Sequence, residues 1–155
     1  MDPRTKHTCR RQLYEFVKDI LVECPKCGKR AMVDTNGYTF FQTMAENVRV
    51  TCSHCAYHKT LNRVSIRSKH FIIGAAFDPF FRLPLWLKTE MYGEVLWAYN
   101  HEHLDILEQH VAAKLRERNG FKYRIKGIGA RLPRWMTAAK NREEVLKAIE
   151  RLKVK

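Results

Sequence analysis

Four of the five cysteines stand in two Cys-x-x-Cys pairs, which are Cys24 with Cys27 and Cys52 with Cys55. Two such pairs can bring four thiolates to one point, and zinc prefers this tetrahedral donor set with Zn–S bonds of about 2.3 Å. Pro25 stiffens the first turn, and Gly28 can adopt the positive φ that follows the second ligand of a knuckle. The second pair is followed by Ala56, which is less favourable there. The pattern predicts one zinc ion held by all four thiolates.

The spacing between the two pairs bears on the kind of metal site. The 24 residues between Cys27 and Cys52 exceed the common spacing of about 15 to 20, and a hairpin turn at Asn36-Gly37 accounts for the extra length. A redox dithiol pair and an iron–sulfur centre are the alternatives, but the chain has neither a thioredoxin-like βαβ pattern nor ferredoxin spacing. Four thiolates leave no position for water, so we expect the zinc to be structural and not hydrolytic.

Apolar periodicity predicts the secondary structure of the first half of the chain. Apolar residues from Leu13 to Leu21 recur at helical spacing, which predicts an N-terminal helix over 8–22. Short runs rich in β-branched and aromatic residues then predict strands on both sides of the Asn36-Gly37 turn and after the second cysteine pair. The expected strands are 30–35, 38–44, 48–51 and 57–67, followed by a buried strand over 69–76.

The second half alternates between apolar and cationic segments. An aromatic-rich hairpin is expected over 80–99, with its turn at Met91-Tyr-Gly93. Asn100 is the expected N-cap of a helix over 101–118 that ends at Asn119-Gly120. The remaining expected elements are a half-buried strand over 121–126, a short helix over 132–139 and a last helix that opens with a capping box from Asn141 to Glu144 and buries Val145, Ile149 and Leu152.

Residues 22–66, about a third of the chain, resemble the zinc-ribbon class found in general transcription factor B and in many bacterial proteins of uncharacterised function. The segment 131–152 is similar to the end of some of those bacterial proteins. The expected fold is α+β, with an N-terminal helix, a four-cysteine zinc-ribbon β unit, an aromatic-rich β hairpin and basic C-terminal helices. We place the boundary between two domains, 1–68 and 69–155. The resemblance implies a fold element, and ribbons of this class often contact nucleic acid or serve as protein-binding elements.

Positive charge is concentrated at the C-terminal end of the chain. The net charge is +13; residues 1–113 carry 15 Lys and Arg against 12 Asp and Glu, whereas 114–155 carry 14 against 4. A concentrated excess favours a polyanionic partner. We therefore predict nucleic-acid binding mainly through phosphates, with Trp135 as a base-stacking platform. The expected contact residues are Lys122, Arg124, Lys126, Arg131, Arg134, Trp135, Lys140, Lys147, Arg151 and Lys155.

Other functions stay open at this point. A solvated basic face or an acidic protein partner would explain the same charge, so a protein-binding adaptor, or a neutraliser of an acidic protein, is the alternative to a regulatory or accessory nucleic-acid-binding protein. His101 and Asp105 fall one helical turn apart and could chelate a catalytic metal, but a nuclease needs a third ligand or base that no motif announces. We therefore expect no enzyme and no small-molecule substrate. The choice between DNA and RNA is not specified.

Hydropathy bears on where the protein works. No run reaches the roughly 18 to 20 apolar residues that a membrane span needs, because Asp78 and Pro79 interrupt the longest candidate, over 71–81. The N-terminus lacks the apolar region of a secretory signal. Paired cysteines in a reducing compartment favour metal over disulfides. We expect a cytoplasmic protein without membrane contact.

Overall fold

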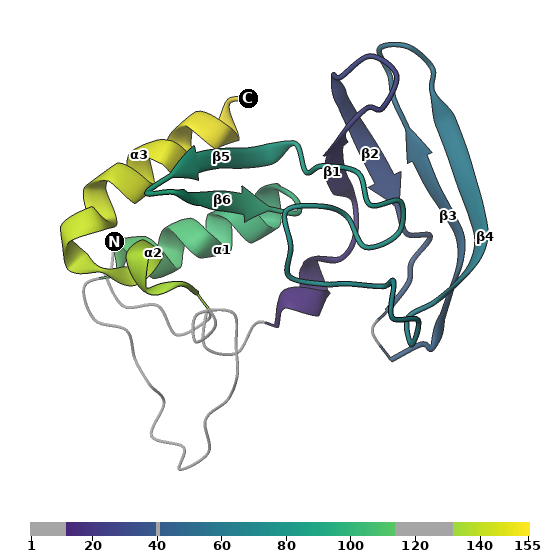
Figure 1. Cartoon of the computed structure of the whole chain (residues 1–155), viewed down its shortest axis with the longest axis horizontal. Coiled ribbons are helices and arrows are strands. Elements are labelled where there is room, and N and C mark those ends of the chain that lie inside the picture. Colours follow the sequence, from purple (N-terminus) through teal and green to yellow (C-terminus); the bar gives the residue numbers. More distant parts are fainter. Residues whose placement is uncertain (1–11, 40, 114–131) are drawn as a thin grey trace.

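The computed structural model describes residues 12–39, 41–113 and 132–155, and the fold is α+β (Figure 1). A four-stranded antiparallel sheet has the order β1-β2-β3-β4, and a separate hairpin pairs β5 with β6. The strands are β1 (Ile20–Glu23), β2 (Arg30–Asp34), β3 (Met44–Thr51), β4 (His58–Ser65), β5 (Leu87–Met91) and β6 (Glu94–Ala98). The helices are η1 (Leu13–Phe16), α1 (His101–Ala112), α2 (Arg134–Thr137), η3 (Ala139–Asn141) and α3 (Arg142–Lys153). None of the described helices is both long and apolar enough to cross a membrane.

Alternating side chains give the four-stranded sheet one apolar face. Ala31 and Val33 of β2 are buried while the residues between and beside them are exposed or half-buried. Val33 is paired with Ile20 on one side and with Val50 on the other, so buried residues of three strands form a row across the sheet. The outermost strand, β4, has no fully buried residue. The apolar face is therefore built mainly by β1, β2 and β3.

The hairpin and the long helices form the other half of the molecule, with α1 and α3 beside β5 and β6 (Figure 1). Asn100 caps α1 as predicted, because its side chain accepts a hydrogen bond from the His103 backbone at 2.9 Å. The Asn100 amide also donates to the carbonyls of Phe16 and Lys18 at 3.1 and 2.7 Å. One side chain thus begins the helix and fixes the chain segment that enters β1.

Strand β1 joins the two halves because both of its edges are hydrogen-bonded. One edge pairs with β2, and on the other edge Leu21 donates to the Tyr99 carbonyl at 2.8 Å and accepts from the Trp86 backbone at 2.9 Å. Glu23 extends this edge by donating to the carbonyl of Pro84 at 2.8 Å. The hydrophobic core runs through both halves without interruption. The predicted boundary at residue 68 stays a prediction.

The predicted N-terminal helix over 8–22 is wrong in its described part. Only the single 3-10 turn η1 forms, and Asp19 then adopts a positive φ of 45° that no helix accommodates. The segment continues as β1, whose residues Ile20 and Val22 are fully buried. Pairing on both edges of β1 outweighs an apolar spacing that also fits a helix.

Two predicted strands are also wrong. The described residues of 38–43 form a turn in which Thr39 and Gln42 hydrogen-bond to each other, so β3 begins only at Met44. The segment 69–76 is irregular, with a backbone turn from Ser68 to Phe71. Phe71 and Ile73 pack against the core, Ile72 is exposed, and no described strand pairs with the segment. The strands predicted over 30–35, 48–51 and 57–67 are present. The hairpin turn predicted at Met91-Tyr-Gly93 is also present, between the paired residues Met91 and Glu94.

The helices predicted for the second half of the chain are confirmed in part. Helix α1 ends at Ala112, and the predicted cap at Asn119-Gly120 and strand over 121–126 lie outside the described residues. The short helix is confirmed as α2, with Pro133 at its N-cap. The capping box of α3 does not form: the Asn141 amide donates to the carbonyl of Trp135 at 2.9 Å, and the Glu144 carboxylate accepts from the Tyr92 hydroxyl at 2.5 Å. The side chains of Asn141 and Glu144 therefore hydrogen-bond to other residues and not to the first turn of α3.

Candidate metal centre

The structure brings the four cysteines of the two pairs together at one end of the four-stranded sheet. Their sulfur atoms all lie within 4.8 Å of one another, and the Sγ–Sγ distances are 3.6 Å for Cys24 to Cys55 and 3.6 Å for Cys27 to Cys52. Four sulfurs at about 2.3 Å from a tetrahedral zinc ion would lie about 3.8 Å apart, whereas a disulfide needs about 2.05 Å. The spacing therefore fits a shared metal ion and excludes disulfides.

The first knuckle follows directly from β1. Cys24 closes it by donating to the Lys29 carbonyl at 2.8 Å and by accepting from the Gly28 backbone at 2.8 Å. The Lys26 backbone points at the Cys24 sulfur, with a nitrogen–sulfur distance of 3.4 Å. Gly28 has a φ of +72°, as its position after the second ligand predicts. A Cβ at Gly28 would meet no atom within 4 Å, so only the backbone conformation requires glycine there.

The second knuckle lies between β3 and β4 and repeats this geometry with a less suitable residue. Cys52 donates to the Tyr57 carbonyl at 2.8 Å, which closes the turn as Cys24 closes the first one. Ala56 takes the place of Gly28 and adopts a φ of +58°. A residue with a Cβ loses roughly 1 to 2 kcal/mol in this left-handed region. The second knuckle is therefore strained at one residue, although it places its two sulfurs as well as the first.

The surroundings of the cluster shift the pKa values of its thiols in different directions. Burial raises the pKa of Cys24, but backbone N–H groups and the neighbouring thiols outweigh it and lower the pKa from 9.0 to about 7. The pKa of Cys52 is lowered by the same balance. The backbone of Tyr57 lowers the pKa of Cys55, but burial and the three other thiols raise it to about 12. Metal ligation requires deprotonated sulfur, so a bound cation would release the proton that the cluster retains.

The cluster bridges antiparallel strands through two knuckles, which is the arrangement of a zinc-ribbon-like unit. It can hold one metal ion, and its donor set fits zinc. Comparison of the chain with protein-family models, with curated proteins and with solved structures found no match. We therefore infer the class of the site from its own geometry.

The predicted nucleic-acid contact residues fall into two groups. Lys122, Arg124, Lys126 and Arg131 lie outside the described residues. Arg134, Lys140, Lys147, Arg151 and Lys155 lie on α2, η3 and α3 or just after α3, and all five are exposed. Lys147 forms a salt bridge with Glu143 at 3.4 Å, and its side chain is 59% exposed. Trp135 is half-buried, and its ring lies beside that of Tyr92 in the hairpin turn, with 6.0 Å between the ring centroids and a tilt of 53°.

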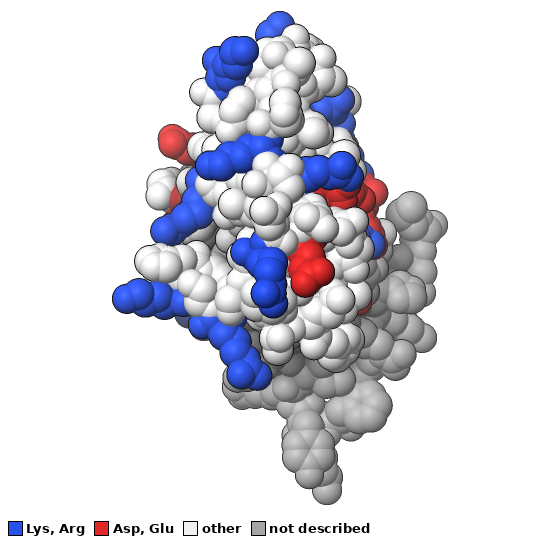
Figure 2. All heavy atoms as spheres, turned by 90° about the vertical axis from the view of Figure 1, so that its right-hand side faces the viewer, with Lys and Arg blue, Asp and Glu red and all other residues white. Residues whose placement is uncertain are grey.

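The four-stranded sheet with its two knuckles, which we call the ribbon, carries exposed cations that the sequence analysis did not assign to a surface. Figure 2 faces this end of the molecule and shows Lys and Arg side chains spread over it, with fewer Asp and Glu. Two of these cations are paired, Arg49 with Asp34 at 3.4 Å and Arg63 with Glu46 at 3.9 Å. The exposed cations of the ribbon are Lys26, Lys29, Arg30, Arg49, Lys59 and Arg63. Positive charge is therefore not confined to the C-terminal third.

The residues weighed for catalysis lie apart from any metal cluster in the described ranges. Asp105 pairs with Lys153 at 2.9 Å, and His101 is exposed. In the part of the chain that the structure describes, the four cysteines are the one group of three or more potential ligands. His103 faces the interior and accepts a hydrogen bond from the Tyr99 backbone at 3.1 Å, and burial lowers its pKa to about 3. His103 is therefore a neutral core residue.

Proposed function

We propose that Cys24, Cys27, Cys52 and Cys55 bind one structural zinc ion. The convergence of four sulfurs within 4.8 Å supports this assignment, because four thiolates complete the tetrahedron that zinc prefers. Four protein ligands leave no open position for a substrate or a water. The ion would cross-link the turn after β1 to the turn after β3, and would thereby hold the β2–β4 part of the sheet.

We further propose that the protein is a nucleic-acid-binding accessory or regulatory protein that contacts phosphates. The observation that carries this proposal is the charge distribution, with 14 Lys and Arg against 4 Asp and Glu in residues 114–155. Such an excess attracts polyanions, and phosphate contacts supply most of non-specific nucleic-acid binding. The exposed cations of α3 and of the ribbon support the same proposal. The role of zinc would be to give the ribbon cations a fixed arrangement.

A salt-titrated binding assay on zinc-loaded protein tests this function. Binding to single- and double-stranded DNA and RNA oligonucleotides is measured by fluorescence anisotropy between about 50 and 200 mM salt, where each phosphate contact contributes roughly 0.7 to 0.9 to the slope of log K against log salt. We expect a steep negative slope with at least one of these ligands. A flat slope, or no binding at the lowest salt, would contradict the proposal and favour the protein-binding adaptor.

A further inference from the structure

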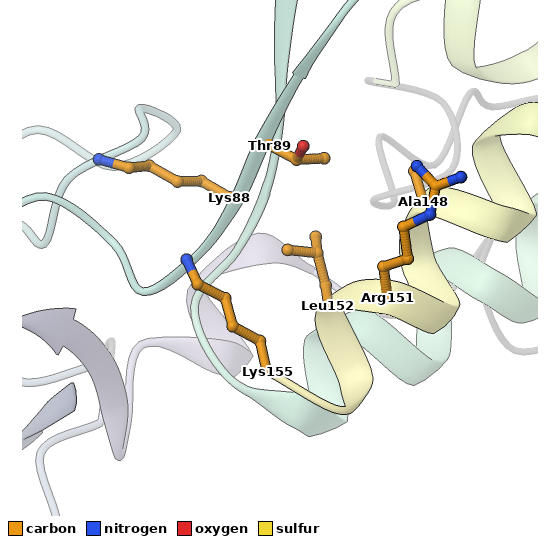
Figure 3. Close-up of a pocket in the computed structure, with 6 residues that line it drawn as sticks. All are labelled: Lys88, Thr89, Ala148, Arg151, Leu152 and Lys155. Carbon is orange, nitrogen blue, oxygen red and sulfur yellow. The ribbon is translucent and has the colours of Figure 1, made fainter. Parts of the chain in front are cut away.

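A groove lies between strand β5 and the C-terminal end of α3. Its cavity of about 280 Å³ is lined by Lys88 and Thr89 from the hairpin and by Ala148, Arg151, Leu152 and Lys155 from α3 and the residues after it (Figure 3). Ala148 and Leu152 are 6% and 4% exposed and pack into the core, so they form an apolar floor. The cationic side chains stand around this floor. Lys88 joins Arg151 and Lys155 although it belongs to the half of the chain with little net charge.

The three cations of the groove differ in the interactions that their side chains already make. Lys88 forms a salt bridge with Glu23 at 3.4 Å, and both side chains are about one-third exposed. Lys155 donates to the Trp86 carbonyl at 2.8 Å, and its Nζ lies 4.5 Å from the Trp86 ring centroid. Arg151 is exposed, and no carboxylate among the described residues lies within ion-pair distance of it. Three positive charges therefore face one carboxylate.

The end of α3 offsets only part of this excess. The carbonyl groups at a helix C-terminus act as roughly half a negative charge. Lys153, which is also near this end, is already paired with Asp105 and Glu108 on the side of α1. The side chains at the groove thus carry three positive charges against one carboxylate, and the helix end offsets only about half a charge of this excess. A diffusing anion would be attracted to it, and Lys155 is already held in place by Trp86.

We infer that this groove binds phosphate groups of a nucleic-acid backbone, an inference that rests on the proposed nucleic-acid binding. An arginine fork donates two parallel hydrogen bonds to a phosphate, and Lys155 and the Thr89 hydroxyl add further donors. Arg151 lies in the last turns of α3 and Lys155 follows the C-cap at Val154. Their side chains leave the groove floor on different sides of Leu152 (Figure 3), so they can contact neighbouring phosphates. The volume is at the lower limit of about 300 Å³ for small-molecule pockets, which suits a phosphate group better than a whole nucleotide.

The test compares Arg151→Gln/Lys155→Gln with Lys18→Gln/Lys69→Gln on the zinc-loaded full chain. Lys18 and Lys69 are the matched control because they also remove two positive charges, are exposed, and lie outside the groove and outside the residues expected to contact nucleic acid. We expect the groove variant to lower the magnitude of the salt slope by about two, and the control to change it by less than about one. Equal slopes for the groove variant and the control would overturn the groove assignment while leaving the proposed function intact. Failure of the wild-type protein to bind any oligonucleotide would overturn both.

A second measurement identifies the source of the phosphate and does not depend on stability of the variants. The Nε–H signal of Arg151 is followed by NMR during titration of the wild-type protein with inorganic phosphate, with a short oligonucleotide and with a polyglutamate peptide. Shifts at lower concentration of the oligonucleotide support a backbone site. Shifts with inorganic phosphate alone would overturn the nucleic-acid source and assign the groove to a free phosphate compound. Shifts only with the acidic peptide would overturn it in favour of a protein partner.

Discussion

The ribbon and the hairpin–helix half differ in what holds them together. Most of the largest fully buried side chains belong to the hairpin, α1, α3 and the adjoining segments, among them Tyr99, Leu87, Leu104 and Ile149. The ribbon buries mainly small β-branched residues and alanines, and its last strand β4 has no fully buried residue. Buried apolar area stabilises the hairpin–helix half by about 25 cal/mol per Å². The ribbon has less of it, so the proposed zinc ion would supply part of the stabilisation that the hairpin–helix half obtains from its core.

The two halves are nevertheless not independent, because β1 is hydrogen-bonded to both. Loss of the metal should therefore loosen the ribbon from its knuckle end, where the outer strand β4 contributes no fully buried residue. The pairing of Leu21 with Tyr99 and Trp86 should persist, since it lies on the other edge of β1. Four sets of substitutions test whether the proposed metal stabilises the ribbon and the core stabilises the hairpin–helix half.

The largest effect is expected from Cys52→Ser. Metal binding in four-ligand structural zinc sites contributes on the order of 10 kcal/mol, and one lost thiolate removes most of it. Native-state hydrogen exchange should show loss of protection in β2, β3 and β4 with protection retained in α1 and α3. The control is Cys9→Ser, which makes the same change outside the two pairs and should leave both zinc content and protection unchanged. Protection retained in β2–β4 of the Cys52 variant would contradict the division between the halves.

Ile149→Ala should destabilise the hairpin–helix half and leave the metal site intact. Ile149 is fully buried in α3, and truncation of such a residue costs about 2 to 5 kcal/mol through lost burial and the cavity left behind. Denaturant unfolding should show that loss, and the zinc content of the folded protein should stay at the wild-type level. The exposed Val154→Ala is the control and should change the free energy of unfolding by less than about 0.5 kcal/mol. Loss of zinc from the Ile149 variant would show that the core holds the metal site.

Asn100→Ala tests the junction between the halves. The substitution removes the cap of α1 and leaves the carbonyls of Phe16 and Lys18 without their side-chain donor. Loss of an N-cap costs about 0.5 to 2 kcal/mol, and unsatisfied carbonyls add to this, so we expect a loss of about 2 kcal/mol in the free energy of unfolding. The variant Asn100→Ser keeps a capping oxygen but lacks the amide that reaches the two carbonyls, so a loss as large as that of alanine would place the whole effect at the carbonyls.

The smallest expected effects come from two substitutions at equivalent positions of the two knuckles. Gly28→Ala adds a Cβ at a φ of +72° and should destabilise the protein by about 1 kcal/mol. Ala56→Gly removes the Cβ at a φ of +58° and should stabilise it by about 0.5 to 1 kcal/mol. Thermal unfolding of the two variants should therefore shift in opposite directions. Shifts of the same sign would mean that the two turns do not share one conformation.

The sequence predicted the parts of the structure that depend on local chemistry. Cysteine spacing predicted which four thiols converge, and Asn100 predicted the start of α1 from its capping chemistry alone. Prediction failed where tertiary pairing decides. Residues 20–23 fit a helical face as well as a strand, and only the two neighbours of β1 select the strand. The groove could not be predicted either, because Lys88 and Arg151 are far apart in the sequence and meet only when α3 packs beside β5.

The most direct test of the central claim is the metal content and ligand set of the purified protein. Elemental analysis should give one zinc ion per chain, and X-ray absorption at the zinc edge should give four sulfur neighbours at about 2.3 Å. Protein without stoichiometric zinc that keeps β2–β4 protected in the presence of a strong chelator would contradict the account. A first shell containing nitrogen or oxygen would also contradict it, because the four thiolates would then not share one ion.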